Sequence, residues 1–479
     1  MSTAIVWLRQ DLRLADNPAL FYACQSARRV VLLYIHAPDE LAPWAPGDAS
    51  RWWLHQSLLS LQRELQSLGV TLVIRAGTSL GALHALIGQT AAETVYANAL
   101  YEPAAVRRDQ DVQRSLAEIG VDWRLYHGNL LFAPGSVLNK QGEPYRVFTP
   151  FWKSCQQALP VESPLPRPEF IAGIGGITTI TLDQLDLQSG LSLRPEVKES
   201  WRVGEVAAGE GLETFCSHAI MLYSKGRDVP GIRGTSRLSP HLHFGEISPR
   251  QVVWRLNQEF QQAGVAGHVD AYIRELGWRE FANHILHFFP HSSDSAMDER
   301  FSHFPWRHDD GLMRSWQQGI TGFPIVDAGM RELWQTGWMH NRVRMIVASF
   351  LTKNCLMHWR DGARWFWDTL VDADLASNSM GWQWVAGCGV DAAPYFRIFN
   401  PILQSRKFDS DGAYIRRWVP ELSALSNRYL HAPWLAAPGD LVAAKVKLGT
   451  TYPAPVLDLG DTRERALACY RGLGDFRVG

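Results

Sequence analysis

A short polar segment in the second half of the chain has the composition of an anion-binding loop. It runs Gly234-Thr-Ser-Arg-Leu-Ser239 and precedes a stretch expected to be helical. Free backbone N–H groups, hydroxyls and a guanidinium can converge in such a loop on a diphosphate. An ordinary helix N-cap beside a surface arginine would have the same composition, so the segment alone leaves both interpretations open.

Two further features could carry chemistry. His241 and His243 could form a metal pair, but no third ligand cluster lies near them in the sequence, so we expect two packed histidines and no metal site. The chain also holds 20 tryptophans in 479 residues, 12 of them between Trp201 and Trp384. Such rings could be packing groups, stacking platforms or redox groups, and packing is the commonest role for any single one.

Length and composition describe a folded protein of several domains. At roughly 150 residues per domain, 479 residues predict about two to four domains. Hydrophobic residues make up 46% and charged residues 20%, which excludes wholesale disorder and fibrous repeats. The formal net charge is −1, so any contact with nucleic acid must come from a local basic patch.

The sequence gives no indication of export or of a membrane span. The N-terminal stretch carries charges at Arg9, Asp11 and Arg13, and no run of about 18 apolar residues occurs. The six cysteines lie far apart and form no C-x-x-C pair, which argues against a disulfide framework. We therefore expect a cytoplasmic protein.

Residues 4 to about 130 alternate between short strands and helices. Five buried strands are expected at Ile5–Leu8, Val30–His36, Val70–Arg75, Thr94–Asn98 and Val121–Tyr126. Helices are expected between them at Pro18–Arg28, Ala49–Leu68, Ser79–Gln89 and Pro103–Ile119. This order predicts an α/β domain with a Rossmann-like parallel sheet. The first strand-to-helix turn has no glycine, so the usual dinucleotide site is not expected.

A connector and a helical domain follow. Residues from about 134 to 195 are rich in Pro, Gly, Ser and Thr and have little helical periodicity. Beyond Trp201 the periodicity is helical near 205–223, 248–262, 268–288, 310–318, 324–336, 340–358 and 362–370. We therefore expect an α/β domain at 1–132, an interdomain connector at 133–200 and an all-α domain at 201–479.

Three segments of the second domain carry a resemblance to a known family. They are Glu275-Leu-Gly-Trp278-Arg279, Trp338-Met-His-Asn341-Arg342 and the stretch from Asp372 to Trp384. Together with IVWLRQDLRLADNPAL near the start and DAAPYFRIFNP near the end, they make the chain similar to the DNA photolyase and cryptochrome family over essentially its whole length. The resemblance implies an N-terminal antenna domain, a long connector and a helical domain that holds FAD.

The resemblance also implies which residues bind FAD. The matching positions are Tyr223, Thr235, Ser236, Arg237, Leu238, Ser239, Arg279, Arg344, Asp372, Asp374 and Asn378. Asp372 and Asp374 alone would be typical of a solvated turn. In a buried site, Arg344 would neutralise Asp372 and make its burial tolerable. Asn378 matches the residue that faces the reactive flavin nitrogen, where plant cryptochromes carry Asp, and its uncharged amide favours repair over signalling.

A pocket for a flipped pyrimidine dimer is implied as well. Its positions match Glu275, Trp278, Asn341, Met345 and Trp384. Trp278 and Trp384 would stack on the dimer, whereas Glu275 and Asn341 would hydrogen-bond the base edges. Phosphates around the pocket would contact Arg227, Arg342, Arg397 and Gln404; Arg406 and Lys407 are equally compatible with solvated charges.

Three tryptophans match the family's electron relay from the flavin to the surface: Trp382, Trp359 and Trp306. Each ring alone would be expected to pack in the core, and the joint match at three positions favours the relay. We therefore expect catalytic roles for these three residues and for Glu275, Asn341 and Asn378.

The implied activity is light-driven DNA repair. A cyclobutane pyrimidine dimer photolyase is a carbon–carbon lyase in which excited, reduced FAD lends an electron to the dimer and recovers it. Related (6-4) photolyases have a histidine where this chain has Asn341, so the cyclobutane dimer is the expected lesion. A cryptochrome-like photoreceptor and a (6-4) photolyase are the alternatives, and a light-independent flavin oxidoreductase is a more distant one.

An antenna chromophore and a partner are implied too. The Asn-Glu pair with which folate-binding bacterial photolyases contact the pterin is absent, and the chain has Tyr101-Glu102-Pro103 there. The stretch Trp44–Trp53 is more similar to relatives of plant cryptochromes. We expect 5,10-methenyltetrahydrofolate first, with a deazaflavin, FMN or no antenna as alternatives. UV-damaged DNA is the expected partner of a cytoplasmic monomer that associates with the nucleoid during repair and contacts no membrane.

Overall fold

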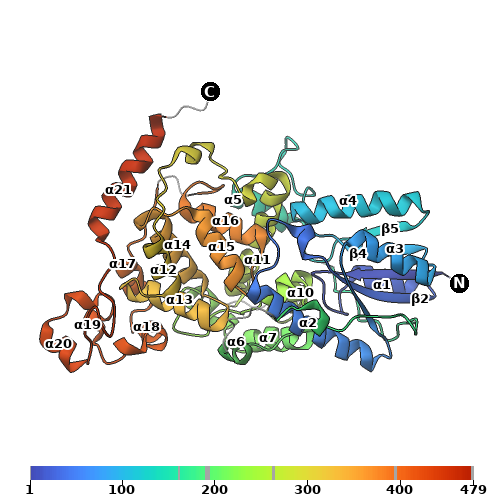
Figure 1. Ribbon diagram of the computed structural model, residues 1–479, viewed down its shortest axis with the longest axis horizontal. Helices are drawn as coiled ribbons and strands as arrows, with labels where there is room; N and C mark the ends of the chain where they lie inside the picture. The colour runs from blue at the N-terminus through green and yellow to red at the C-terminus, as the bar shows by residue number, and fades with distance from the viewer. Residues whose placement is uncertain (1, 160–161, 189–194, 261–264, 393–395, 476–479) are drawn as a thin grey trace.

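A parallel sheet of five strands forms the core of the N-terminal domain (Figure 1). The computed structural model describes residues 2–159, 162–188, 195–260, 265–392 and 396–475. The strands are β1 (Thr3–Leu8), β2 (Arg29–His36), β3 (Leu72–Ala76), β4 (Thr94–Asn98) and β5 (Asp122–Tyr126). They lie in the order β3-β2-β1-β4-β5, and all neighbouring pairs are parallel. The predicted Rossmann-like sheet is confirmed, but the expectation of a buried strand was wrong for β5, which lies at the edge of the sheet and has no buried residue.

Helices cover both faces of this sheet. They are α1 (Pro18–Ser26), α2 (Asp48–Ser67), α3 (Ser79–Thr90) and α4 (Pro103–Glu118). Ala4, Val6 and Leu8 of β1 share a core with α1 and α2, whereas Ile5 and Trp7 share the opposite core with α3 and α4. Successive side chains of a strand point to opposite faces, so β1 contributes side chains to both cores.

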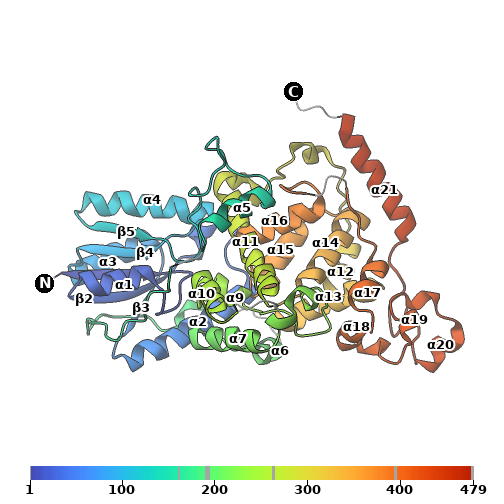
Figure 2. The same cartoon turned by 180° about the vertical axis from the view of Figure 1, so that it is seen from behind.

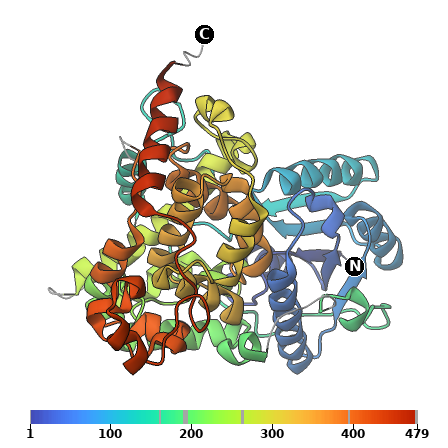
Figure 3. The ribbon, with the colours of Figure 1, turned by 60° about the vertical axis from the view of Figure 1, so that its left-hand side comes forward.

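The second domain is helical, as expected (Figure 2). Its helices are α7 (Glu205–Ser217), α8 (Tyr223–Gly226), α9 (Ser239–His243), α10 (Pro249–Glu259), α11 (Ala266–Phe288), α12 (Asp310–Gln318), α13 (Pro324–Thr336), α14 (Asn341–Ser349), α15 (Trp359–Thr369), α16 (Leu375–Ala386), α17 (Pro401–Phe408), α18 (Ala413–Trp418), α19 (Asn427–Leu430), α20 (Pro438–Ala443) and α21 (Leu459–Gly472). Figure 3 shows the sheet beside this helical body, with α21 in red on the side away from the N-terminus.

Two local predictions for the helical domain were wrong. The segment 340–358 is not one helix, because α14 ends at Ser349 and a π-helical turn, Phe350–Asn354, follows it before α15 begins. The sequence also gave no signal for α16, because its buried residues lie on several sides and form no single apolar stripe.

The connector also contains regular structure. Helix α5 (Phe148–Gln157) lies within it and buries Phe148, Phe151, Trp152 and Cys155 in a core shared with α11. A second short helix, α6 (Pro195–Ser200), lies at its end. The prediction of little helical periodicity was wrong here, because the Pro- and Gly-rich flanks hid an apolar spacing of three to four residues. The connector thus supplies part of the core of the helical domain.

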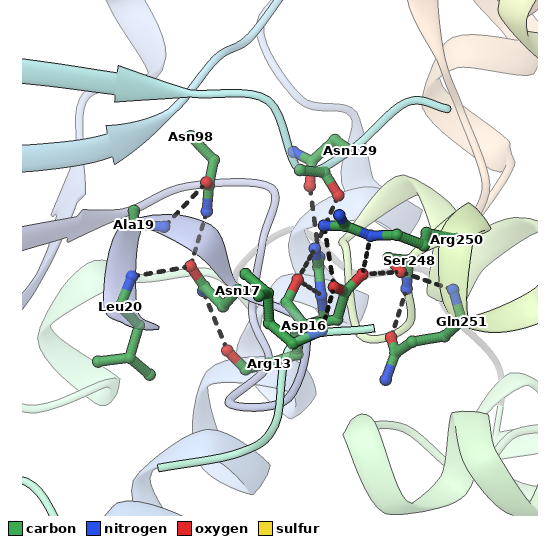
Figure 4. Close-up of polar contacts among 12 residues, drawn as sticks. Arg13, Asp16, Asn17, Ala19, Leu20, Asn98, Asn129, Ser248, Arg250 and Gln251 are labelled. Carbon is green, nitrogen blue, oxygen red and sulfur yellow. Dashed lines mark hydrogen bonds and ion pairs between the residues drawn. The ribbon is translucent and has the colours of Figure 1, made fainter. Parts of the chain in front are cut away.

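The loop after β1 joins the two domains (Figure 4). Arg13 is fully buried, and its guanidinium donates to the backbone carbonyls of Asp16, Gly128 and Gly245. The Asp16 carboxylate accepts from Ser248 Oγ and from Arg250 Nε, at the start of α10. The turn that binds dinucleotides in other parallel sheets therefore serves here as an interdomain joint.

Candidate functional site

The segment 234–239 forms a turn that packs closely on α8. A Cβ at Gly234 would lie 2.4 Å from the carbonyl oxygen of Gly226, so only glycine fits this approach. Ser236 Oγ accepts a hydrogen bond from Tyr272 Oη at 2.9 Å. Helix α9, which follows, has no side-chain cap. The alternative of an ordinary N-cap therefore does not describe this segment.

Arg237 lies at the centre of the turn with a left-handed φ of 54°. Its Cζ lies 4.3 Å from the ring centroid of Trp201 and 4.8 Å from that of Trp338. Its buried Nε has no hydrogen-bond partner among the described residues. Burial lowers the pKa of Arg237 to about 10. A guanidinium held over aromatic rings with an unused N–H is suited to an anionic group.

Trp338 links this turn to an ion pair on its other side. Its Nε1 donates to Ser239 Oγ at 3.2 Å, and Arg344 Cζ lies 5.8 Å from its ring centroid. Arg344 Nη2 contacts the Asp372 carboxylate oxygens at 2.8 and 3.1 Å. Asp372 is only 7% exposed. The ion pair expected between Arg344 and Asp372 is thus present, and it compensates the burial of the carboxylate.

Asp374 caps the N-terminus of α16. One carboxylate oxygen accepts from the Ser377 N–H at 2.8 Å, and the other lies 3.7 Å from His243 Nδ1. Burial acts to raise the pKa of Asp374, but contact with His243 and attraction to Arg279 outweigh it and hold that pKa below its usual range. The carboxylate is therefore ionised.

Asn378 lies one turn further along α16. Its Nδ2 donates to the Ala363 carbonyl of α15 at 3.0 Å, which fixes the amide plane and leaves Oδ1 to face away from that bond. Asn378 is half-buried, and its neighbour Ser377 is exposed. An oriented amide of this kind can accept a hydrogen bond from a ligand without adding charge.

These residues fit the flavin cofactor that the resemblance implies. Tyr223 is buried edge-to-face against Tyr272 at 5.2 Å and forms an apolar wall. Two buried nitrogens make no hydrogen bond to the described residues: Arg237 Nε has no partner, and His243 Nδ1 has only the Asp374 carboxylate, 3.7 Å away. Buried polar atoms are normally paired, so unpaired ones beside carboxylates and hydroxyls mark a ligand contact. Thr235 and Leu238 belong to the same turn.

Arg279 is placed differently from the other predicted cofactor residues. Its guanidinium donates to the backbone carbonyls of Asn129 at 2.7 Å and Leu242 at 3.3 Å. It therefore ties α11 to the loop after β5 and to α9, and its role toward a cofactor stays a prediction.

Ion pairs tie the predicted lesion residues of α11 and α14 to the segment that follows α8. Arg227 Nη1 contacts Glu275 Oε1 at 2.5 Å, and Arg342 Nη2 contacts the Asp228 carboxylate at 2.8 Å. Arg342 Nη1 also lies 3.6 Å from Met345 Sδ. Asn341 begins α14 and is exposed. These charged and polar residues form what we call the rim: Arg227, Asp228, Glu275, Asn341 and Arg342.

The two predicted stacking rings have different surroundings. Trp278 stacks on Phe148 of α5 with ring centroids 3.7 Å apart. Trp384 Nε1 donates to the Asp391 carbonyl at 3.0 Å, and its ring lines a small cleft with Arg397. No ring contact joins Trp278 to Trp384 in the described part of the chain. Gln404 is half-buried on α17, and Arg406 and Lys407 are exposed.

Two of the three relay tryptophans are connected through a histidine. The centroids of Trp306 and His358 are 5.1 Å apart, and those of His358 and Trp359 are 5.7 Å apart. Trp382 packs directly on α15, where a Cβ at Gly362 would lie 2.1 Å from its ring. Trp359 and Trp382 are buried, whereas Trp306 is half-buried. Of the three rings, Trp306 is therefore the one nearest the surface.

Sequence reasoning missed several residues of this region. Phe148 came from a connector in which no helix was expected, although its spacing to Phe151, Trp152 and Cys155 was a usable signal. His358 precedes Trp359 directly and carried no signal of its own. Trp334 and Trp365 stack at 5.9 Å with an interplanar angle of 6°, a pairing that sequence spacing could not indicate.

Two hollows lie between the domains. One lies at the carboxyl ends of β1 and β2 and is lined by Arg9, Tyr34, His36, Trp44, Glu102 and His243 among others. The other has a volume of about 330 Å³, shares Trp44 and Glu102 with the first, and reaches His291 and Asp294. Burial raises the pKa of Glu102 between them.

Among the described residues, no three His, Cys, Asp or Glu side chains come together in a way that could hold a metal ion. Within the same residues, no helix is long and apolar enough to cross a membrane.

Comparisons with known proteins agree with this architecture. Residues 4–169 match the family model described as DNA photolyase, and residues 272–472 match the FAD binding domain of DNA photolyase. A deoxyribodipyrimidine photo-lyase of Agrobacterium fabrum is 43% identical over 97% of each chain, and Cryptochrome-1 of Arabidopsis thaliana is 38% identical over 96% of this chain and 69% of its own. The crystal structure of a bacterial class III photolyase from Agrobacterium tumefaciens superposes with a TM-score of 0.96 at 42% identity, covering 99% of this chain and 98% of that one.

The fold and the match to the FAD binding domain together define a flavoprotein of the photolyase type. The chain belongs to the DNA photolyase and cryptochrome family. FAD is the cofactor to which its helical domain is matched.

Proposed function

We propose that this protein is a deoxyribodipyrimidine photo-lyase that splits cyclobutane pyrimidine dimers in UV-damaged DNA under blue light. One observation carries the proposal. Helix α14 presents Arg344 to the buried Asp372, while Arg342 on the same helix contacts Met345 and Asp228 at the rim. A cofactor-side residue and lesion-side residues thus alternate along one helix, as an enzyme needs when its cofactor acts directly on a bound base.

The proposed chemistry belongs to the cofactor, and the protein positions it. Bound, reduced FAD would supply, after absorbing light, the electron that opens the cyclobutane ring. Asp372 and Arg344 would orient the isoalloxazine edge, and Arg237 would neutralise the diphosphate. The Asn378 amide, fixed by Ala363, would accept a hydrogen bond at the flavin without supplying a proton.

On the lesion side, ion pairs would hold the proposed lesion-binding side chains in position before DNA binds. Arg227 holds the Glu275 carboxylate, which would accept hydrogen bonds from a base edge. Asn341 is exposed at the start of α14 and would donate to the opposite edge. Trp278, backed by Phe148, and Trp384 would give the apolar walls on which the dimer stacks. Arg397 and Gln404 would contact the flanking phosphates, with the enzyme acting as a monomer.

Trp382, Trp359 and Trp306 would carry an electron from the surface to oxidised FAD. The ring contacts through His358 support the outer part of this relay. The close packing of Trp382 on Gly362 supports the inner part.

A cryptochrome-like photoreceptor is the second candidate, favoured by the 38% identity to Arabidopsis thaliana Cryptochrome-1. Asn378 argues against it, because an aspartate there could donate a proton to the flavin. A (6-4) photolyase is disfavoured by Asn341.

An antenna chromophore would occupy the space between the domains. The groove beside Trp44, Glu102 and Asp294 offers an indole wall and carboxylates to a pterin, which supports methenyltetrahydrofolate. The hollow at β1 and β2 offers Arg9 and His36 to a phosphorylated flavin instead. Extraction of the purified protein and chromatography against both standards would distinguish them.

The deciding experiment is blue-light restoration of an oligonucleotide that contains one cyclobutane thymine dimer. Purified, chemically reduced protein would be tested with a dark control and a (6-4) oligonucleotide in parallel. Restoration of the cyclobutane lesion alone, in light alone, is the expected result. If neither lesion is repaired by protein with photoreducible FAD, the photoreceptor becomes the better assignment.

A further inference from the structure

The π-helical turn after α14 carries a lysine in an unusual position. Lys353 is only 1% exposed, and the turn Phe350–Asn354 that bears it is buried throughout. The Cys355 N–H donates to the Phe350 carbonyl at 3.0 Å, five residues back, which defines the turn. Such turns insert one residue into a helix and re-aim the side chains beyond it, often at functional sites.

Lys353 holds the end of α16. Its Nζ donates to the carbonyl of Ala386, the last residue of that helix, at 2.8 Å. The carbonyls at a helix C-terminus carry partial negative charge and favour a nearby cation. Lys353 forms no ion pair with any described carboxylate, and burial lowers its pKa well below the usual range. Burying this polar amine away from water and from any described carboxylate is costly, so packing alone does not explain it.

The same lysine holds a second segment. Its Nζ lies 3.0 Å from the ring centroid of Phe396. Four residues earlier, Ser349 Oγ accepts the Phe399 N–H at 3.1 Å. The two side chains lie on one face of the continuous α14 and π-helical element, because residues four apart in a helix are neighbours. Together they hold residues 396–399 at both ends.

Arg397 and Trp384 are what these contacts fix in place. Arg397 is exposed between the two held residues, and Trp384 lies two residues before Ala386 on α16. A small cleft is lined by Ser349, Lys353, Trp384, Gly387, Arg397 and Phe399. Lys353 and Ser349 form its floor, and the two groups proposed to meet damaged DNA form its walls.

We propose that Lys353 and Ser349 are positioning residues for damage recognition: they set the distance between the stacking ring of Trp384 and the phosphate-binding Arg397. The inference rests on the proposed lesion role of those two residues. Neither Lys353 nor Ser349 touches DNA in this arrangement. Their removal therefore changes how well the damaged strand fits and leaves the flavin and its photochemistry as they are.

The test uses FAD-loaded protein and fluorescence anisotropy with one oligonucleotide, either undamaged or carrying a single cyclobutane dimer. Lys353→Met keeps the length and apolar body of the side chain and removes its N–H donors. We expect the Kd for damaged DNA to rise by about tenfold, the scale of one lost hydrogen bond, and the Kd for undamaged DNA to change by less than about twofold. Ser349→Ala should act in the same direction. Lys447→Met, at an exposed lysine, is the matched control and should change neither.

Two further readouts separate positioning from a general loss of structure. The repair rate at saturating DNA and the flavin absorption spectrum should stay at wild-type values, so that KM changes and kcat does not. In an Arg397→Ala background, Lys353→Met should have little further effect, because coupled residues are not additive. Full additivity in that background, or an unchanged ratio of damaged to undamaged affinity in both variants, would overturn the inference.

Variants of Arg397 and Trp384 distinguish failure of this inference from failure of the proposed function on which it rests. If Arg397→Ala and Trp384→Ala leave damaged-DNA affinity unchanged, the lesion assignment itself is wrong. If they weaken it and the Lys353 and Ser349 variants do not, only the positioning role fails.

Discussion

Two buried polar regions of this molecule differ in how completely their groups are paired. At the interdomain joint, Arg13 and Asp16 are 0% exposed, and each forms several hydrogen bonds across the domain boundary. Of the residues labelled in Figure 4, only Asn129 has a buried atom without a partner in the described part of the chain, its Nδ2. In the candidate flavin site, Arg237 Nε has no hydrogen-bond partner among the described residues, and His243 Nδ1 has only the Asp374 carboxylate, 3.7 Å away.

This difference indicates that the paired groups stabilise the fold and that the unpaired groups bind a ligand. A satisfied buried network rigidifies the structure, and removing one member leaves its partners uncompensated. An unpaired buried group costs free energy in the absence of a ligand and returns it when one binds. Substitutions at the joint should therefore change stability, and substitutions in and around the cavity should change cofactor or DNA chemistry.

Function and stability should separate most completely at Trp382. Trp382→Phe keeps a ring against Gly362 but removes the oxidisable indole. We expect photoreduction of bound, oxidised FAD to be largely abolished, measured by absorbance under blue light, while chemically reduced protein still repairs DNA. Trp316 is as deeply buried as Trp382, and the two ring centroids are 6.1 Å apart. Trp316→Phe is therefore the matched control, and its FAD should be photoreduced normally. Equal loss in both variants would remove Trp382 from the relay.

The joint should show the opposite behaviour at Asp16. Asp16→Asn removes the charge that faces Arg250 and lies close to Arg13, and leaves buried cations without their partner. We expect the free energy of unfolding to fall by about 3 to 5 kcal/mol, measured with urea. Asp122 is 70% exposed and only loosely paired, so Asp122→Asn should stay within about 0.5 kcal/mol of wild type. Wild-type stability of Asp16→Asn would contradict the structural role of the joint.

The joint also marks where sequence reasoning stops. In the sequence, its charged loop argued against an apolar leader and against a dinucleotide site, but it did not predict the joint, because the partners of Arg13 lie up to 232 residues away. The strands were predictable, since a short apolar run between turn residues needs no distant information. The joint, in contrast, exists only once both domains have folded.

The cofactor residues were predictable for a different reason. Local patterns left Asp372 and Asp374 as a solvated turn, and only the resemblance assigned them to a cavity. The structure then adds what neither source contained: the Arg237 guanidinium between two indoles, and the amide plane of Asn378 fixed by Ala363. These features depend on packing between helices far apart in sequence.

A substitution of Arg237 tests the expectation that groups of the candidate flavin site affect cofactor binding and not stability. Arg237→Met removes a half-buried cation whose buried Nε has no partner in the described structure, so the protein without FAD should be as stable as wild type or more so. Its affinity for FAD should fall by about 1.5 to 3 kcal/mol, the scale of a hydrogen bond to a charged group. Fluorescence titration with FAD and urea unfolding of the apoprotein measure the two effects, with the exposed Arg463→Met as control. Loss of stability without loss of FAD would place Arg237 with the joint.

Trp278 gives the smallest effect and the sharpest distinction, because it both packs and is proposed to bind the lesion. Trp278→Ala should weaken binding of dimer-containing DNA by about 1 to 3 kcal/mol, the usual value of a lost base stack. Phe148→Leu disturbs the same 3.7 Å stack from the other side and leaves the indole in place. Both variants should lose some stability, but only Trp278→Ala should lose affinity for damaged DNA beyond its loss for undamaged DNA. If the two variants bind damaged DNA equally well, Trp278 acts through packing alone and belongs with the paired groups of the fold.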